Sequence, residues 1–156
     1  MKKVFFCSFF IFLIISCTTT KQLTPTEMKA ISTKQFDANY DMVFRSAVSL
    51  LQSEGFLIER TDKETGLINA SKRIDNKKFG YQENASTSKI VFYVEAINKE
   101  LTEVKLTIYE GSIQKKSGSY GHQQSSNTES VVQDAAIYQA WFYNLRTEIE
   151  RRKATY

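Results

Sequence analysis

The sequence predicts an α+β domain in which an antiparallel sheet of four to five strands carries two helices on one face, in the order β-α-β-β-β-β-α. Residues 89–97 and 101–113 alternate apolar and polar side chains, which is typical of strands with one buried face. Residues 40–54 and 128–153 repeat apolar side chains every three or four positions, which predicts helices with one apolar stripe. Because such stripes need a sheet face to cover, we expect both helices on the same side of the sheet.

The first predicted helix follows a weak first strand at residues 30–36. Asn39 precedes the helix and can accept a hydrogen bond from its first turn, with Asp37 and Asp41 as alternative caps. The sequence therefore predicts that the helix begins at about residue 40.

The residues after this helix predict where it ends and where two strands follow. Gly55 stands where a helix commonly ends on a left-handed residue, and Phe56 beyond it can fold back on the helix. Residues 56–61 and 67–72 then read as two strands joined by a turn at residues 62–66.

Two polar stretches, residues 76–88 and 114–127, lack apolar periodicity, and we expect both to be mobile loops. The tetrapeptide Ser-Asn-Thr-Glu at residues 126–129 fits a capping box. We therefore expect a closing helix over residues 128–153, about 39 Å long, that extends past strands of about 23 Å. Its apolar stripe comprises Val131, Ala135, Tyr138, Phe142, Leu145 and Ile149.

The chain begins with a predicted signal peptide. Lys2 and Lys3 precede an apolar run at residues 4–15. As a helix this run would span about 18 Å, against about 30 Å of bilayer hydrocarbon, so it is too short to cross a membrane. A charged start followed by a short apolar run is typical of a signal for export.

The end of this run, Ile14-Ile15-Ser16-Cys17, resembles the lipobox of bacterial lipoproteins, although Leu more often stands where Ile14 does. The resemblance implies signal cleavage between Ser16 and Cys17 by signal peptidase II, with lipid attached to Cys17. We therefore expect a signal peptide at residues 1–16, a flexible tether at 17–29 and one domain at 30–153. Anchoring by two or more acyl chains would be stable.

The anchor also sets the expected location and charge. Thr18 and Thr19 are not acidic, and in proteobacterial lipoproteins an Asp after the lipidated cysteine often marks retention in the inner membrane. The sequence thus favours the outer membrane, facing the periplasm. Loss of Lys2 and Lys3 lowers the formal charge from +4 to +2, so we expect no nucleic acid as a partner. Loss of Cys7 leaves only Cys17, so no disulfide is expected within the mature chain.

The order of elements resembles the helix-grip domains of the C component of the β-barrel assembly machinery, over residues 31–152. It is also similar to small envelope lipoproteins with a helix, Gly-Phe, and a strand–turn–Gly–strand unit, here residues 40–51, Gly55-Phe56 and Asp62 to Ile68. The resemblance implies an accessory or scaffolding role in envelope assembly.

The residues themselves predict no enzyme and no cofactor. One histidine, His122, and no free cysteine cannot form a zinc site, and no Gly-rich phosphate loop or nucleophile elbow is present. Asp62 and Glu64 flank a turn, where a structural role is expected, and a calcium loop needs more oxygen ligands. We therefore expect no catalytic and no metal-binding residues.

Aromatic side chains crowd the closing helix, namely Tyr138, Trp141, Phe142 and Tyr143. We favour core packing for them. The alternative is a binding module that grips an apolar small molecule or lipid between this helix and the sheet. The leading prediction is a non-enzymatic interaction or assembly protein, held to the membrane through Cys17, with an envelope protein as its partner.

Overall fold

The computed structural model of the protein describes residues 22–77, 82–117 and 123–155. Its helices and strands, in chain order, are α1 (Pro25–Ser32), β1 (Thr33–Phe36), α2 (Tyr40–Ser53), β2 (Leu57–Asp62), β3 (Leu67–Lys77), β4 (Gln82–Ala96), β5 (Thr102–Ser117), β6 (Gln123–Val131) and α3 (Ala135–Lys153). The strands form one antiparallel sheet in the order β1-β5-β4-β3-β2. β1 pairs with residues 102–105 of β5, and β6 pairs with residues 109–117 of the same strand. The predicted α+β class is confirmed, but the described sheet has six strands rather than four to five.

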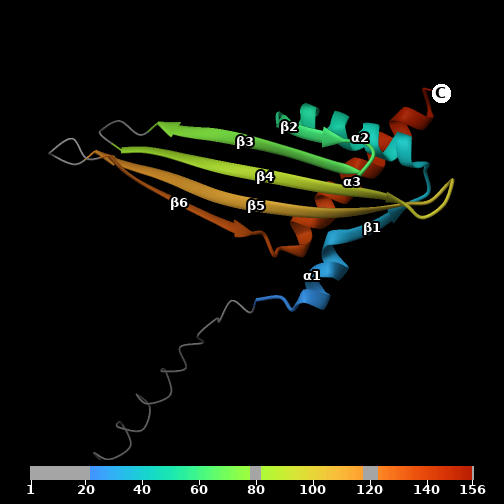
Figure 1. The fold of residues 1–156 in the computed structure, drawn as a ribbon, viewed down its shortest axis with the longest axis horizontal. Helices are drawn as coiled ribbons and strands as arrows, with labels where there is room; N and C mark the ends of the chain where they lie inside the picture. The colour runs from blue at the N-terminus through green and yellow to red at the C-terminus, as the bar shows by residue number, and fades with distance from the viewer. Residues whose placement is uncertain (1–21, 78–81, 118–122, 156) are drawn as a thin grey trace, which may run out of the picture.

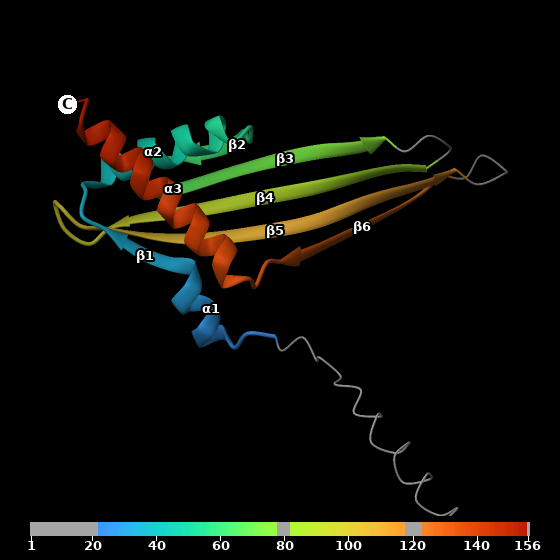
Figure 2. The ribbon, with the colours of Figure 1, turned by 180° about the vertical axis from the view of Figure 1, so that it is seen from behind.

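The core lies between one face of the sheet and the helices α2 and α3, which cross that face side by side (Figures 1 and 2). Alternate residues of the three central strands point into it, as the sequence pattern predicts. The buried side chains from the sheet are Ile68, Ala70, Ile90, Phe92, Val94, Val104, Leu106 and Ile108. Those from the two helices include Val43, Ala47, Leu50, Leu51, Tyr138, Phe142, Leu145 and Ile149.

Local signals fix both ends of α2. The Asn39 side chain accepts a hydrogen bond from the Met42 N–H at 2.9 Å, so Asn39 is the N-cap. At the other end Gly55 has φ +77°, and the Phe56 N–H donates to the Leu51 carbonyl at 2.9 Å. This is the 6→1 hydrogen bond that defines a Schellman motif at the end of a helix. The predicted cap and the predicted left-handed glycine are confirmed.

Helix α1 occupies residues that the sequence analysis assigned to the tether and the first strand. Thr24 and Glu27 form a reciprocal capping box around Pro25. Met28 and Ile31 pack against the core, and α1 contacts α3. Residues 25–29 are therefore a docked helix, and β1 is only four residues long.

The two stretches expected to be mobile loops are mostly strand, and this prediction was wrong. β3 and β4 stay paired as far as Lys77 and Glu83, and β5 and β6 as far as Ser117 and Gln123. Antiparallel pairing satisfies the main-chain hydrogen bonds of these polar segments, although Ala85, which is buried outside the core cluster, is the one apolar side chain described as buried in them. His122 and the rest of residues 118–122, like residues 78–81, lie outside the described residues.

The closing helix starts later than predicted. Thr128 and Val131 belong to β6, and α3 begins at Ala135 behind the N-cap Asp134, which accepts from the Ala136 N–H at 2.8 Å. The 19 residues of α3 span about 28 Å, whereas the 16 residues of β5 span about 53 Å. The prediction that the closing helix extends past the strands was therefore wrong, because β5 is longer than α3.

The sheet instead projects far beyond the helix layer, as Figure 1 shows at its left side. We call the projecting part the ribbon. It comprises residues 72–77 of β3, 82–89 of β4, 109–117 of β5 and all of β6. In Figure 2 the helices end well before the far ends of these four strands.

Candidate interaction surface

Aromatic side chains occupy the described space between α3 and the sheet. Tyr138 is fully buried, and its hydroxyl donates to the Val132 carbonyl at 3.0 Å. Trp141 meets Phe56 and Phe92 edge-on, with ring centroids 5.7 and 6.3 Å apart. This is the geometry of aromatic core packing. Burial raises the pKa of the Tyr138 hydroxyl above its ordinary value.

A surface groove beside α3 is lined by both polar and apolar groups. Ile31 and Phe142 contribute apolar surface, and Lys34, Gln35, Glu103 and Gln139 contribute polar side chains. An apolar ligand would have to remove several of these polar groups from water without offering them hydrogen bonds, which is costly. The groove is thus a poor match for a lipid or an apolar small molecule.

The turn that carries Asp62 has a structural role. The Asp62 carboxylate accepts hydrogen bonds from the N–H groups of Glu64 at 3.0 Å and Thr65 at 3.2 Å. The hydrogen bonds from Thr65, with a smaller contribution from Glu64, lower the Asp62 pKa. The described residues hold no group of three or more His, Cys, Asp or Glu side chains suited to a metal ion.

Other residues named in the sequence analysis lie elsewhere. Ser16 and Cys17, the predicted cleavage and lipidation residues, lie outside the described residues, as His122 does. Of the helices in the described ranges, none has the length and apolar content needed to cross a bilayer.

The basic end of α3 packs against the rest of the domain. Lys153 donates to the Asp37 carbonyl at 2.9 Å, and Arg152 approaches the Arg45 carbonyl at 3.5 Å. Arg151 is paired with Glu148, and this pairing lowers the Glu148 pKa. These cations therefore satisfy carbonyl and carboxylate groups of this chain, and they do not form a free overhang.

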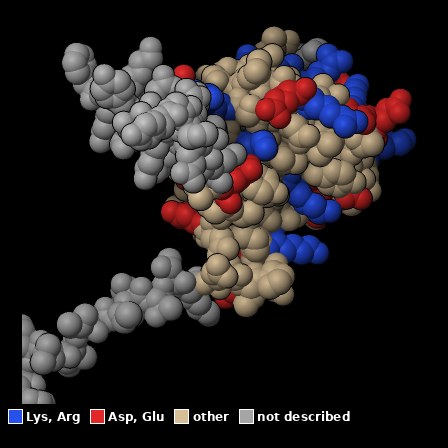
Figure 3. Space-filling model, turned by 60° about the vertical axis from the view of Figure 1, so that its left-hand side comes forward, with Lys and Arg blue, Asp and Glu red and all other residues tan. Residues whose placement is uncertain are grey.

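The face of the sheet opposite the helices is uncovered in the described structure and chemically mixed. Tyr93, 39% exposed, lies beneath the Lys105 ammonium, which is 5.3 Å from the ring centroid. Leu57 on the edge strand β2 is 72% exposed. In the side view of Figure 3, basic and acidic side chains are interspersed. Charge of one sign therefore does not dominate this view of the molecule.

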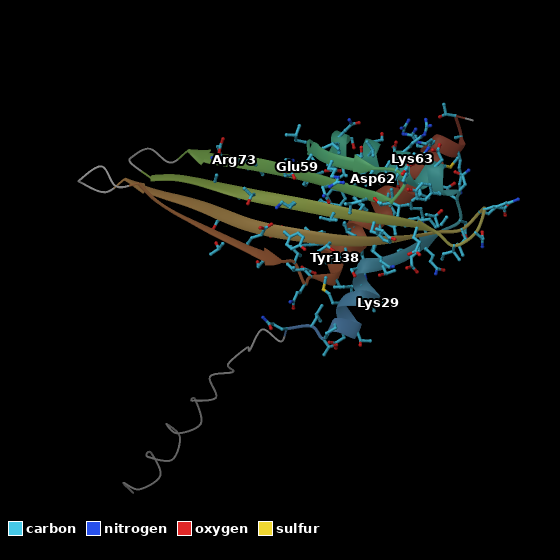
Figure 4. The ribbon with its side chains drawn as sticks, viewed as in Figure 1. Lys29, Glu59, Asp62, Lys63, Arg73 and Tyr138 are labelled. Carbon is cyan, nitrogen blue, oxygen red and sulfur yellow. The ribbon has the colours of Figure 1, made fainter. Side chains whose placement is uncertain are left out.

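The ribbon offers two free main-chain edges. β2 pairs with β3 only up to Ser71, so residues 72–77 of β3 have no described strand beside them. β6 pairs with β5 on one side, and its other side faces no described strand. In Figure 4 Arg73 lies on β3 beyond the start of β2, whereas Glu59 and Asp62 lie on β2 and Lys63 follows it. Ile74, on the β3 edge, is 51% exposed.

These features define a class of protein: an α+β domain with a filled core and a projecting antiparallel ribbon whose edges are open. No known family model matches the chain, and no curated protein matches it significantly.

Proposed function

We propose that this protein is a lipid-anchored envelope protein that acts without catalysis, as an interaction or assembly factor that presents its ribbon to a protein partner. The observation that carries the proposal is the ribbon itself. Four strands continue beyond the helix layer, and no further strand of the described structure pairs with either outer edge. The N–H and C=O groups along such an edge are a template for pairing with another strand.

The docked helix α1 supports a short connection to the membrane. The Leu23 N–H donates to the Gln133 side chain at 2.9 Å, close to the start of α3. Six peptide units separate Leu23 from Cys17, which allows a reach of about 20 Å. Lipidation at Cys17 would therefore hold the domain close to the membrane surface, and a partner would be met there.

The filled interior supports an interaction role over a small-molecule grip. Tyr138, Trp141 and Phe92 occupy the volume between α3 and the sheet that such a ligand would need. A protein partner needs no cavity and can use strand pairing at an edge.

Lipidation is tested by growing cells with an alkyne fatty acid and comparing the wild-type chain with Cys17→Ala. We expect label on the wild type and none on the variant. Label retained on Cys17→Ala would exclude Cys17 as the anchor.

The ribbon is tested with a photo-crosslinking amino acid placed at Ile74, on its β3 edge. The matched control is Tyr143, which is 71% exposed but lies on α3, away from the ribbon. We expect a discrete crosslinked product in intact cells from position 74 and none from position 143. Equal products at the two positions, or a product at position 143 alone, would contradict a partner on the ribbon.

A further inference from the structure

The hydrogen bond between Val132 and Ile108 shows which main-chain groups of β6 face outward. The Val132 N–H donates to the Ile108 carbonyl at 2.9 Å, in register with the β5–β6 ladder. In an antiparallel strand the N–H and C=O groups of one residue point to the same side, and those of the next residue point to the opposite side. The outward set along the free edge of β6 is therefore Gln123, Ser125, Asn127, Glu129 and Val131.

Two copies of this edge can face each other without placing like charges opposite one another. When two β6 strands run antiparallel about an axis at Asn127, Asn127 faces Asn127 of the second copy. Ser125 then faces Glu129 of the second copy, and Gln123 faces Val131. No charge of one sign opposes a charge of the same sign, so the destabilising like-charge pairs of facing strands are avoided.

The other described edges oppose such self-pairing. The hydrogen bond from the Val94 N–H to the Gly66 carbonyl shows by the same alternation that Arg73, Asp75 and Lys77 face outward on β3. An antiparallel copy centred on Asp75 would place Asp75 opposite Asp75 and Arg73 opposite Lys77. The edge of β2 is irregular, with a register shift between Ile58 and Arg60. Like charges and a register shift of this kind disfavour pairing of these two edges with a second copy of themselves.

We propose that the free edge of β6 pairs with β6 of a second copy of this chain, antiparallel and two-fold symmetric about Asn127. The five facing pairs would exchange about ten main-chain hydrogen bonds and join two ribbons into one continuous sheet. The contact is isologous, so it closes as a dimer and does not propagate into a fibre. The pairing goes beyond the proposed function and does not depend on the anchor.

The pairing is tested first by proximity. Asn127→Cys is introduced into the full chain, and intact cells are treated with a short, membrane-permeant bismaleimide. The wild type gives the background from any unmodified native cysteine, and Ile74→Cys on the opposite edge is the matched control. We expect a crosslinked dimer from Asn127→Cys well above both. Equal yields from positions 127 and 74 would overturn the proposal.

The second test uses charge at the axis. Asn127→Lys places two ammonium groups opposite each other, and Asn127→Glu places two carboxylates. Each purified full-length variant in detergent should show at least a tenfold weaker dimer than the wild type by mass photometry, with an unchanged far-ultraviolet spectrum. Mixing the two variants should restore the dimer, because opposite charges then face each other.

This rescue separates pairing from folding, because a misfolded variant would not recover its dimer on mixing. A wild-type chain that stays monomeric, or a dimer that survives both substitutions, would overturn the proposal. The fatty-acid labelling of Cys17 is independent of these outcomes, so failure of the dimer is distinguishable from failure of the proposed function.

Discussion

Gly55 and Gly66 form a matched pair for measuring the effect of a close backbone contact. Their φ angles are +77° and +76°, a region that side chains with a Cβ avoid. A Cβ on Gly55 would meet only the flexible end of Lys72, at 3.6 Å. A Cβ on Gly66 would lie 2.0 Å from the Val94 carbonyl oxygen, which is far inside van der Waals contact. The two alanine substitutions thus share the conformational cost and differ in the steric one.

The magnitudes follow from these surroundings. Gly55→Ala should cost about 1 kcal/mol, the penalty of a left-handed residue with a Cβ. Gly66→Ala carries the same penalty. In addition, it must move the Val94 peptide, whose N–H donates to the Gly66 carbonyl at 2.9 Å. Loss of that ladder hydrogen bond and displacement of buried backbone add about 2 kcal/mol or more. We expect a total of about 3 kcal/mol for Gly66→Ala.

The assay is urea unfolding of the chain from residue 18 onward, followed by circular dichroism. With similar m-values, the midpoint should fall about three times as far for Gly66→Ala as for Gly55→Ala. In thermal melts the corresponding decreases are about 10 °C and about 3 °C for a chain of this size. Equal losses would refute the reasoning, because they would show that the β4 backbone at Val94 yields without cost.

Three further substitutions test the cap, the core and the surface charges. Asn39→Ala removes the cap of α2 and should cost about 1 kcal/mol in urea unfolding; an unchanged midpoint would show that water replaces the cap. Tyr138→Phe leaves the half-buried Val132 carbonyl without its hydroxyl donor and should cost about 1 kcal/mol, and an unchanged midpoint would indicate another donor. Pairing with Lys63 lowers the Asp41 pKa below its ordinary value of 3.8, so its contribution is present above that pH and is lost below it. Asp41→Asn should therefore be less stable than the wild type at about pH 7, by less than about 1 kcal/mol, and the difference should shrink at about pH 2; a constant difference would contradict the ion pair.

The parts of the fold that could be predicted from the sequence are those fixed by neighbours along the chain. Asn39 and Gly55 act on adjacent residues, so the bounds of α2 were accessible. The buried stripe of α3 from Tyr138 to Ile149 follows from periodicity alone. Helix α1 also has a local signal, the capping box of Thr24 and Glu27, although these residues were predicted to be a flexible tether.

The parts that could not be predicted depend on pairing between distant residues. The outer halves of β3 to β6 are polar and show no clear apolar alternation, because both of their faces lie outside the core. Residues 126–129 fit a helix cap locally, yet pairing with β5 holds Thr128 in a strand. Tertiary pairing thus overrode a local signal. The open edges depend on strand order, so the candidate surface was equally inaccessible.

Strand order also determines when each segment can fold. From β2 to β6 every strand pairs with its neighbour in sequence. Each of these pairs can therefore form with a small entropy cost of loop closure. β1 is different, because Thr33 pairs with Lys105, about seventy residues later. Until β5 has been synthesised, α1 and β1 have no sheet to join. Of the described segments, the one nearest the expected anchor is thus synthesised first and is among the last to fold.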